Sequence, residues 1–167
     1  MRIKPEALSP DGYIIDQRQT DNINFGHTSS DRNGCGWIAC YNFLKALDSA
    51  PDPEALLHQL ERTLFGNGAL GLHLFSLIHT LKKQQLPLRY ALRPFHAQQL
   101  AESARAGIVL YYTGSRNHYA AFRRGPDGAL WFYGIVPGKV VKCSMAAFYW
   151  DHVRHSLALT ITTEEHK

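Results

Sequence analysis

Most apolar residues between positions 36 and 104 recur every three or four positions, the spacing of a helix that buries one face. The segment 36–47 has this pattern, with apolar side chains at Trp37, Cys40, Tyr41, Leu44 and Leu47. Similar patterns predict further helices over residues 53–65, 72–85 and 94–104. Asp52 and Pro53 mark one helix start, because Asp caps free backbone N–H groups and Pro fits the first turn.

From residue 107 onward the pattern becomes that of strands. Short apolar runs, together with one earlier run, predict strands over residues 86–92, 108–112, 118–123, 130–133, 139–142 and 156–162. The residues at 125–128 (Gly-Pro-Asp-Gly) have the composition of a hairpin turn. Ser144 predicts the cap of a short helix over residues 145–150. Helices come first and an antiparallel sheet second, so the sequence predicts an α+β fold.

The first 34 residues are polar and rich in Asn, Ser, Asp and Gly, with one short apolar piece at residues 13–15. We expect this segment to be mostly loop. A chain of 167 residues has the size of one domain, and it contains no internal repeat and no low-complexity segment. We therefore expect a single domain over residues 1–167 with a loop-rich N-terminal segment over residues 1–34.

Charge and cysteine content narrow the classes of function. Lys and Arg outnumber Asp and Glu by 18 to 14, and the basic residues are spread along the chain. A nucleic-acid-binding surface needs a clustered basic stripe with interleaved aromatic residues, so we expect no nucleic-acid partner. Three cysteines are an odd number, which argues against a disulfide framework and fits a reducing compartment.

The sequence also lacks signals for targeting, cofactors and metals. Residues 1–6 lack the apolar core of a signal peptide, and the apolar runs are shorter than the ~20 residues that cross a bilayer. We expect a cytoplasmic protein without a membrane partner, although a non-classical export route would leave no trace here. No phosphate-binding loop is present, so we expect no cofactor. Asp151, His152 and His155 lack the Cys and His pairs of a zinc site, so we expect no metal. The oligomeric state is left open.

Cys35 stands where a loop of small residues meets the first long helix. The positive end of a helix can lower the pKa of a cysteine from about 8.5 to about 3.5–7.5. We expect Gly34 and Gly36 to let the backbone turn sharply and to leave space beside the sulfur. A nucleophile needs this combination of lowered pKa, access and nearby N–H groups. The alternative is an inert cysteine at a helix start, and Cys40 on the same helix is expected to be core.

A cysteine nucleophile needs a base, which is usually a histidine. Of the nine histidines, His118 is best placed, because it begins a predicted strand directly after the polar loop 114–117. The alternative is an exposed histidine at the end of a strand.

These two motifs resemble papain-like cysteine peptidases, in particular the C39-like group of double-glycine leader peptidases. The matching residues are Cys35 and Gly36 before an apolar helix, and His118 and Tyr119 before a hairpin. The resemblance covers residues 22–134. It implies a papain-like fold in which N-terminal helices pack on a C-terminal antiparallel sheet. It also implies that Cys35 is the nucleophile, His118 the base, and a peptide or protein the substrate.

Two features of that group are missing. The group carries Asp or Asn about fifteen residues after the histidine to orient the imidazole. Residues 132–134 are Phe, Tyr and Gly, so the third member is unknown. The group also has Gln about six residues before the cysteine to help bind the oxyanion. Position 29 is Ser, and we expect Asn33 or Asn24 to supply the amide beside the backbone N–H of Cys35.

The sequence therefore predicts a cysteine-dependent hydrolase of peptide or amide bonds that uses a Cys–His pair. The missing third member motivates an alternative, a catalytically inactive papain-like module that binds peptides. Transamidation instead of hydrolysis also stays open. A toxin or immunity-type factor that acts on another cell's envelope is a further option, based only on chain size and charge.

Overall fold

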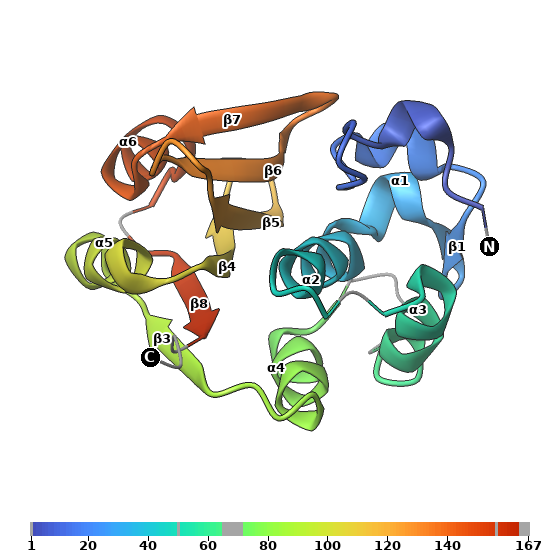
Figure 1. Cartoon of the computed structure of the whole chain (residues 1–167). Coiled ribbons are helices and arrows are strands. Elements are labelled where there is room, and N and C mark those ends of the chain that lie inside the picture. Colours follow the sequence, from blue (N-terminus) through green and yellow to red (C-terminus); the bar gives the residue numbers. More distant parts are fainter. Residues whose placement is uncertain (1, 50, 65–71, 156, 164–167) are drawn as a thin grey trace.

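The computed structural model describes residues 2–49, 51–64, 72–155 and 157–163. Helices lie on both faces of a six-stranded antiparallel sheet (Figure 1). The helices are α1 (Ser30–Asn33), α2 (Cys35–Ala46), α3 (Pro53–Glu61), α4 (Leu74–Lys83), α5 (Pro94–Ser103) and α6 (Met145–His152). The first long helix, α2, lies beside the sheet, and α3 and α4 pack against α2, whereas α5 and α6 cover the opposite face of the sheet.

The large sheet has the strand order β3-β8-β4-β5-β6-β7, and its neighbouring strands run antiparallel. Its strands are β3 (Leu88–Ala91), β4 (Ala106–Tyr112), β5 (Asn117–Arg124), β6 (Leu130–Val136), β7 (Lys139–Cys143) and β8 (Leu159–Thr163). Side chains alternate between the two faces of β5: Tyr119 and Ala121 pack in the core with α2, and Ala120 and Phe122 pack in the core under α5 and α6. The predicted α+β fold with helices on an antiparallel sheet is confirmed.

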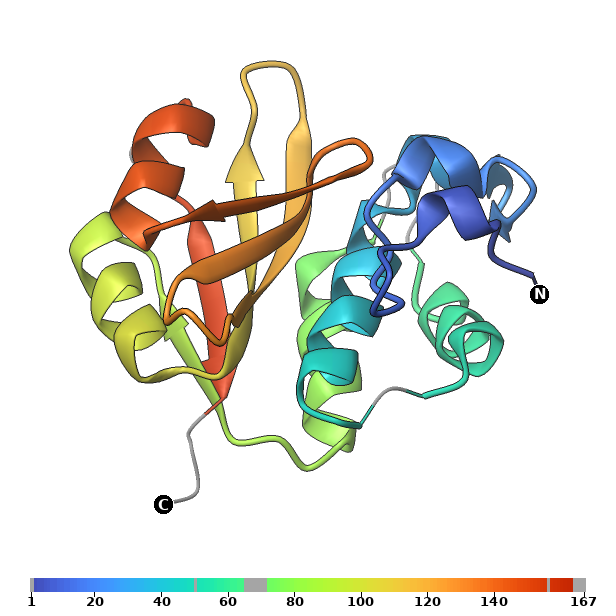
Figure 2. The same ribbon diagram turned by 45° about the horizontal axis from the view of Figure 1, so that its top comes forward.

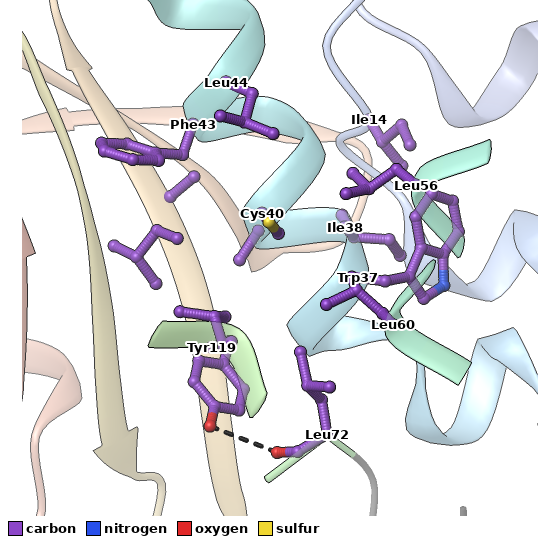
Figure 3. Close-up of a cluster of buried hydrophobic side chains, with 14 of the residues drawn as sticks. Ile14, Trp37, Ile38, Cys40, Phe43, Leu44, Leu56, Leu60, Leu72 and Tyr119 are labelled. Atoms are coloured by element: carbon purple, nitrogen blue, oxygen red, sulfur yellow. Dashed lines mark hydrogen bonds between the residues drawn. The ribbon is translucent and has the colours of Figure 1, made fainter. Parts of the chain in front are cut away.

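The core between α2 and the sheet fixes the start of the helix (Figure 3). Phe43 is fully buried there, and Cys40 is buried as predicted. Trp37 is fully buried on the other side of α2, beside Leu56 and Leu60 of α3. The Tyr119 hydroxyl donates a hydrogen bond of 3.2 Å to the carbonyl oxygen of Leu72, which ties β5 to the segment before α4. The side chain of Leu72 is also buried, so the beginning of α2 is enclosed by apolar residues.

The N-terminal segment has more structure than the predicted loop. It contains two 3-10 turns (Pro5–Ala7 and Gln17–Thr20), the short hairpin of β1 (Asn24–Phe25) and β2 (Thr28–Ser29), and the single turn α1. Asn42 on α2 fixes this segment, since its side chain accepts from the N–H of Ile14 at 2.9 Å and donates to the Ile14 carbonyl at 2.8 Å. Tyr13 stacks on Tyr133 of β6 with ring centroids 4.3 Å apart. These hydrogen bonds and ring contacts to α2 and β6 therefore fix the conformation of a segment whose sequence has no periodic apolar pattern.

The predicted element borders shift by a few residues. Asp52 accepts from the N–H of Ala55 at 2.8 Å, as a cap does, but α3 ends at Glu61 rather than at Phe65, which lies outside the described residues. The last strand is Leu159–Thr163, and Ser156, its predicted start, also lies outside the described residues. In the described part of the chain, the helices are too short or too polar to cross a bilayer.

Candidate active site

The glycines around Cys35 allow close packing rather than a sharp turn. Gly34 is helical (φ −76°, ψ −6°), so α2 follows α1 almost without interruption. A Cβ on Gly34 would lie 2.1 Å from the Oγ of Ser30, which accepts from the Trp37 indole at 2.7 Å. A Cβ on Gly36 would lie 2.6 Å from the Cβ of Leu72. The expected turn at these glycines is therefore wrong, and both are small because neighbouring groups approach them.

The thiol of Cys35 lies beside the part of strand β5 that does not pair with β6. Residues 121–124 of β5 pair with β6. The earlier residues of β5, from Asn117 to Ala120, lie outside this pairing. There the backbone N–H of Tyr119 lies close enough to the Cys35 sulfur to lower the pKa of the thiol. Tyr119 directly follows His118, so the thiol lies beside the peptide group that links these two residues. Helix α2 and strand β5 thus bring residues from distant parts of the sequence together.

Burial raises the pKa of the Cys35 thiol above its ordinary value. The N–H of Tyr119 and the positive charge of Arg116 oppose this effect without outweighing it. The lowered pKa expected from a helix start is therefore wrong. Two physical reasons account for this: the sulfur is removed from water, and the helical Gly34 joins α2 to α1, so Cys35 does not stand at an open helix end.

The ring of His118 is held in a buried position at the start of β5. Its Nε2 lies 2.7 Å from the carbonyl oxygen of Gly134, and its ring packs edge-on against Tyr111 with centroids 5.7 Å apart. Burial lowers the pKa of His118; the hydrogen bond to Gly134 opposes this, and the charge of Arg116 adds to it. Both the thiol and the imidazole are therefore biased toward their neutral forms.

The Gly134 carbonyl reaches His118 because β6 is irregular at this point. Gly134 has a φ of +83°, in the left-handed region that favours glycine. The pairing of β6 with β7 shifts register between Phe132 and Val136. Figure 2 shows the β4–β5 hairpin and the β6–β7 hairpin diverging beyond this point. The carbonyl of Gly134 thus belongs to the part of β6 that has left its pairing with β5.

A groove of about 350 Å³ lies beside His118, between the two diverging hairpins and the N-terminal segment. Its lining residues are Ile15, Gln17, Arg18, Asp31, Tyr111, Thr113, Ser115, Arg116, His118, Gly134, Ile135 and Pro137. Gln17 is not an open amide donor, since its Nε2 donates to the carbonyls of Ser30 and Asp31, each at 3.0 Å. Cys35 is half-buried and does not line this groove.

The predicted oxyanion donors take other positions. Asn33 is buried, and its Nδ2 donates to the carbonyl of Phe25 at 3.1 Å. Asn24 is exposed on β1, which lies on the side of α1 away from the large sheet (Figure 1). Their roles as oxyanion donors stay predictions.

The other cysteines are remote from the groove. Burial raises the pKa of Cys40 to about 12, as fits a core residue. Cys143 on β7 is half-buried, and burial raises its pKa as well. Within the described ranges, no three His, Cys, Asp or Glu side chains form a group that could hold a metal ion.

Sequence reasoning missed two backbone groups and one charge. The N–H of Tyr119 and the carbonyl of Gly134 leave no mark in a sequence, because every residue other than proline carries both groups. One sequence signal could have indicated the carbonyl of Gly134: this glycine stands where the C39-like group has its orienting Asp or Asn. Arg116 was noticed only as part of a polar loop, although its charge acts on both Cys35 and His118.

The fold is similar to two solved structures. No family model and no curated protein matches the sequence. One similar structure is the peptidase domain of Streptococcus ComA, a bi-functional ABC transporter involved in quorum sensing (TM-score 0.55, 16% identity, 80% of this chain and 93% of that chain). Another is a double-glycine-motif protease from an AMS/PCAT transporter in complex with the leader peptide (TM-score 0.51, 13% identity, 77% and 84%). The chain thus has the papain-like fold of these peptidase domains.

Proposed function

We propose that this protein is a cysteine-dependent hydrolase of peptide or amide bonds, with Cys35 as nucleophile and His118 as base. The observation that carries this proposal is the position of the Cys35 thiol beside the backbone N–H of Tyr119, the residue that follows His118. The similarity in fold to two peptidase domains supports the same reaction class.

The neutral resting forms suggest the order of proton transfers. His118 takes the proton of the Cys35 thiol as the sulfur attacks the carbonyl carbon, and the C–S bond forms as the carbonyl becomes an oxyanion. The imidazolium then gives this proton to the leaving amine, and the C–N bond breaks. Water, deprotonated by His118, then attacks the thioester carbon, so that a C–O bond forms, the C–S bond breaks and the acid product leaves. The imidazolium returns its proton to the Cys35 thiolate. The backbone N–H of Cys35 is the proposed oxyanion donor.

The groove beside His118 is the proposed site for an extended peptide. Its walls come from the N-terminal segment and from both hairpins, and its volume is about 350 Å³. A structural neighbour is a double-glycine-motif protease with a bound leader peptide. We propose a peptide with small residues before the cleaved bond as the first substrate class to test.

A second candidate is an inactive module that binds peptides in the same groove. Two observations favour it: burial raises the pKa of Cys35, and Cys35 does not line the groove. A thiol in this state needs the help of His118 to react, whereas a binding module needs neither residue. The two candidates therefore differ in whether His118 controls the reactivity of Cys35.

Covalent labelling separates the two candidates. A peptidyl vinyl sulfone ending in Gly-Gly should label Cys35 of the wild-type protein, as mapped by mass spectrometry. Labelling should fall strongly in His118→Ala and vanish in Cys35→Ser, because the thiol then lacks its base or is absent. Cys143→Ser is the matched control and should be labelled like the wild type. Equal labelling of Cys35 in the wild type and in His118→Ala, by this probe and by iodoacetamide, would favour the binding module.

A further inference from the structure

We propose that the backbone carbonyl of Gly134 orients the His118 imidazole, in place of the Asp or Asn side chain of related peptidases. This inference rests on the proposed function, since it assigns a positioning role in that reaction. It starts from the distance of 2.7 Å between the Nε2 of His118 and the oxygen of Gly134. Gly134 follows His118 by 16 residues, close to the spacing at which the family has its orienting side chain.

The hydrogen bond determines which ring nitrogen carries the proton. A carbonyl oxygen only accepts hydrogen bonds, so Nε2 of His118 must be the donor. A neutral imidazole has one N–H, so Nδ1 keeps its lone pair and is the nitrogen that can accept the proton of Cys35. Because His118 is buried, with 9% of its surface exposed, water competes poorly for this bond.

The residues around Gly134 hold its carbonyl in place. Tyr133, just before it, stacks on Tyr13 and accepts a hydrogen bond of 2.6 Å from Arg123. Gly138, after it, donates its N–H to the carbonyl of Ile15 at 3.0 Å. Both ends of the irregular part of β6 are thus attached to the N-terminal segment or to β5. A carbonyl fixed in this way costs little reorganisation when His118 becomes charged.

Gly134 itself is the residue that allows this orientation. Its φ of +83° is accessible to glycine, tolerable for Asn and unfavourable for a β-branched residue. A Cβ at this position would meet no other atom within 4 Å. A side chain therefore fits in the available space, and a substitution acts through the backbone conformation that aims the carbonyl. Because a side chain at position 134 changes the backbone conformation without a steric clash, this position is suitable for a controlled test.

The first measurement uses the unmodified protein. Long-range ¹H–¹⁵N correlation spectra, assigned by comparison with His118→Ala, report which ring nitrogen is protonated. We expect His118 to be the neutral Nε2–H form at neutral pH. A neutral Nδ1–H form would overturn the proposal. This measurement does not depend on the folding of any variant at position 134.

The second measurement compares Gly134→Asn with Gly134→Val by the rate at which the Gly-Gly vinyl sulfone modifies Cys35. Asn tolerates the left-handed backbone, so Gly134→Asn should keep the Nε2–H signal and should lose less of the labelling rate than Gly134→Val. Val should move the ¹⁵N signal and slow labelling by at least about tenfold; removal of the third member in serine proteases costs ~10⁴-fold. A folded Gly134→Val with unchanged signal and rate would refute the role of this carbonyl.

Failure of the positioning role and failure of the proposed function give different results. A wild-type protein with the Nε2–H signal but no labelling of Cys35 contradicts the hydrolase and leaves the hydrogen bond intact. If the wild-type protein is labelled and both variants at position 134 are labelled at the same rate, the positioning role of Gly134 is contradicted and the proposed hydrolase activity is not.

Discussion

Replacing Gly36 with Ala sets two effects of opposite sign against each other. Ala in place of Gly inside a helix stabilises by about 0.5–1 kcal/mol. The new Cβ would, however, lie 2.6 Å from the Cβ and 2.9 Å from the Cδ2 of Leu72. Overpacking of this kind costs about 1–3 kcal/mol. Leu72 is buried and its carbonyl is bonded to Tyr119, so it cannot easily withdraw. The midpoints of these two ranges differ by about 1.25 kcal/mol, so we expect Gly36→Ala to lower the free energy of unfolding by about 1 kcal/mol.

Urea and thermal unfolding followed by circular dichroism measure this change. The expected fall in Tm is about 2–4 °C for each kcal/mol lost. Leu72→Ala alone should cost about 2–5 kcal/mol, because it leaves a cavity beside α2. The double variant uses Leu72→Gly, because only glycine lacks the Cβ that would lie 2.6 Å from the new methyl group. Leu72→Gly should cost at least ~1 kcal/mol less in the Gly36→Ala background than in the wild type, since it removes the clash. A Gly36→Ala protein as stable as wild type, or additive effects in the double variant, would refute the close packing of these two residues.

Two further predictions concern the thiol and the N-terminal segment. The alkylation rate of Cys35 by iodoacetamide should rise only at a pH above the ordinary range of thiol pKa values, because burial raises the pKa of Cys35. Arg116→Ala should move this pH profile still higher, because the charge of Arg116 lowers the pKa of Cys35. A profile centred near pH 7 would contradict this prediction. Asn42→Ala should destabilise the protein in urea unfolding by about 1–3 kcal/mol for each Ile14 backbone group left unpaired; an unchanged midpoint would show that water replaces the amide.

The fold could be predicted from the sequence where side-chain periodicity determines it. The apolar spacing in residues 36–47 located α2, and the alternation and turn residues located β5 and β6. The end of α3 was placed too late, because helix ends depend on local tertiary contacts as well as on periodicity. The order of the N-terminal segment was missed, since it depends on Asn42, a polar residue on the helix it packs against.

The candidate site shows a similar division. Cys35 and His118 stood out because their residue types and positions fit a known pair. The surroundings that decide their chemistry are contributed by residues distant in sequence, or by backbone groups that any residue carries. The pKa of Cys35 is one example: the helix position suggested a lowered value, whereas burial against β5 raises it. Sequence patterns locate reactive groups more readily than the solvation of those groups.

The N-terminal segment lines the groove and is also bonded to the turn beside the strand that carries Gly134. Ile14 is bonded through both its backbone groups to Asn42 on α2, and the next residue, Ile15, accepts from Gly138 in the turn between β6 and β7. Two consecutive peptide units therefore bridge the helical half and the sheet half of the molecule. Displacing them would release the β6–β7 hairpin, which carries Gly134. A ligand that pushes this bridge outward would change the access to the groove and the basicity of His118 in a single movement.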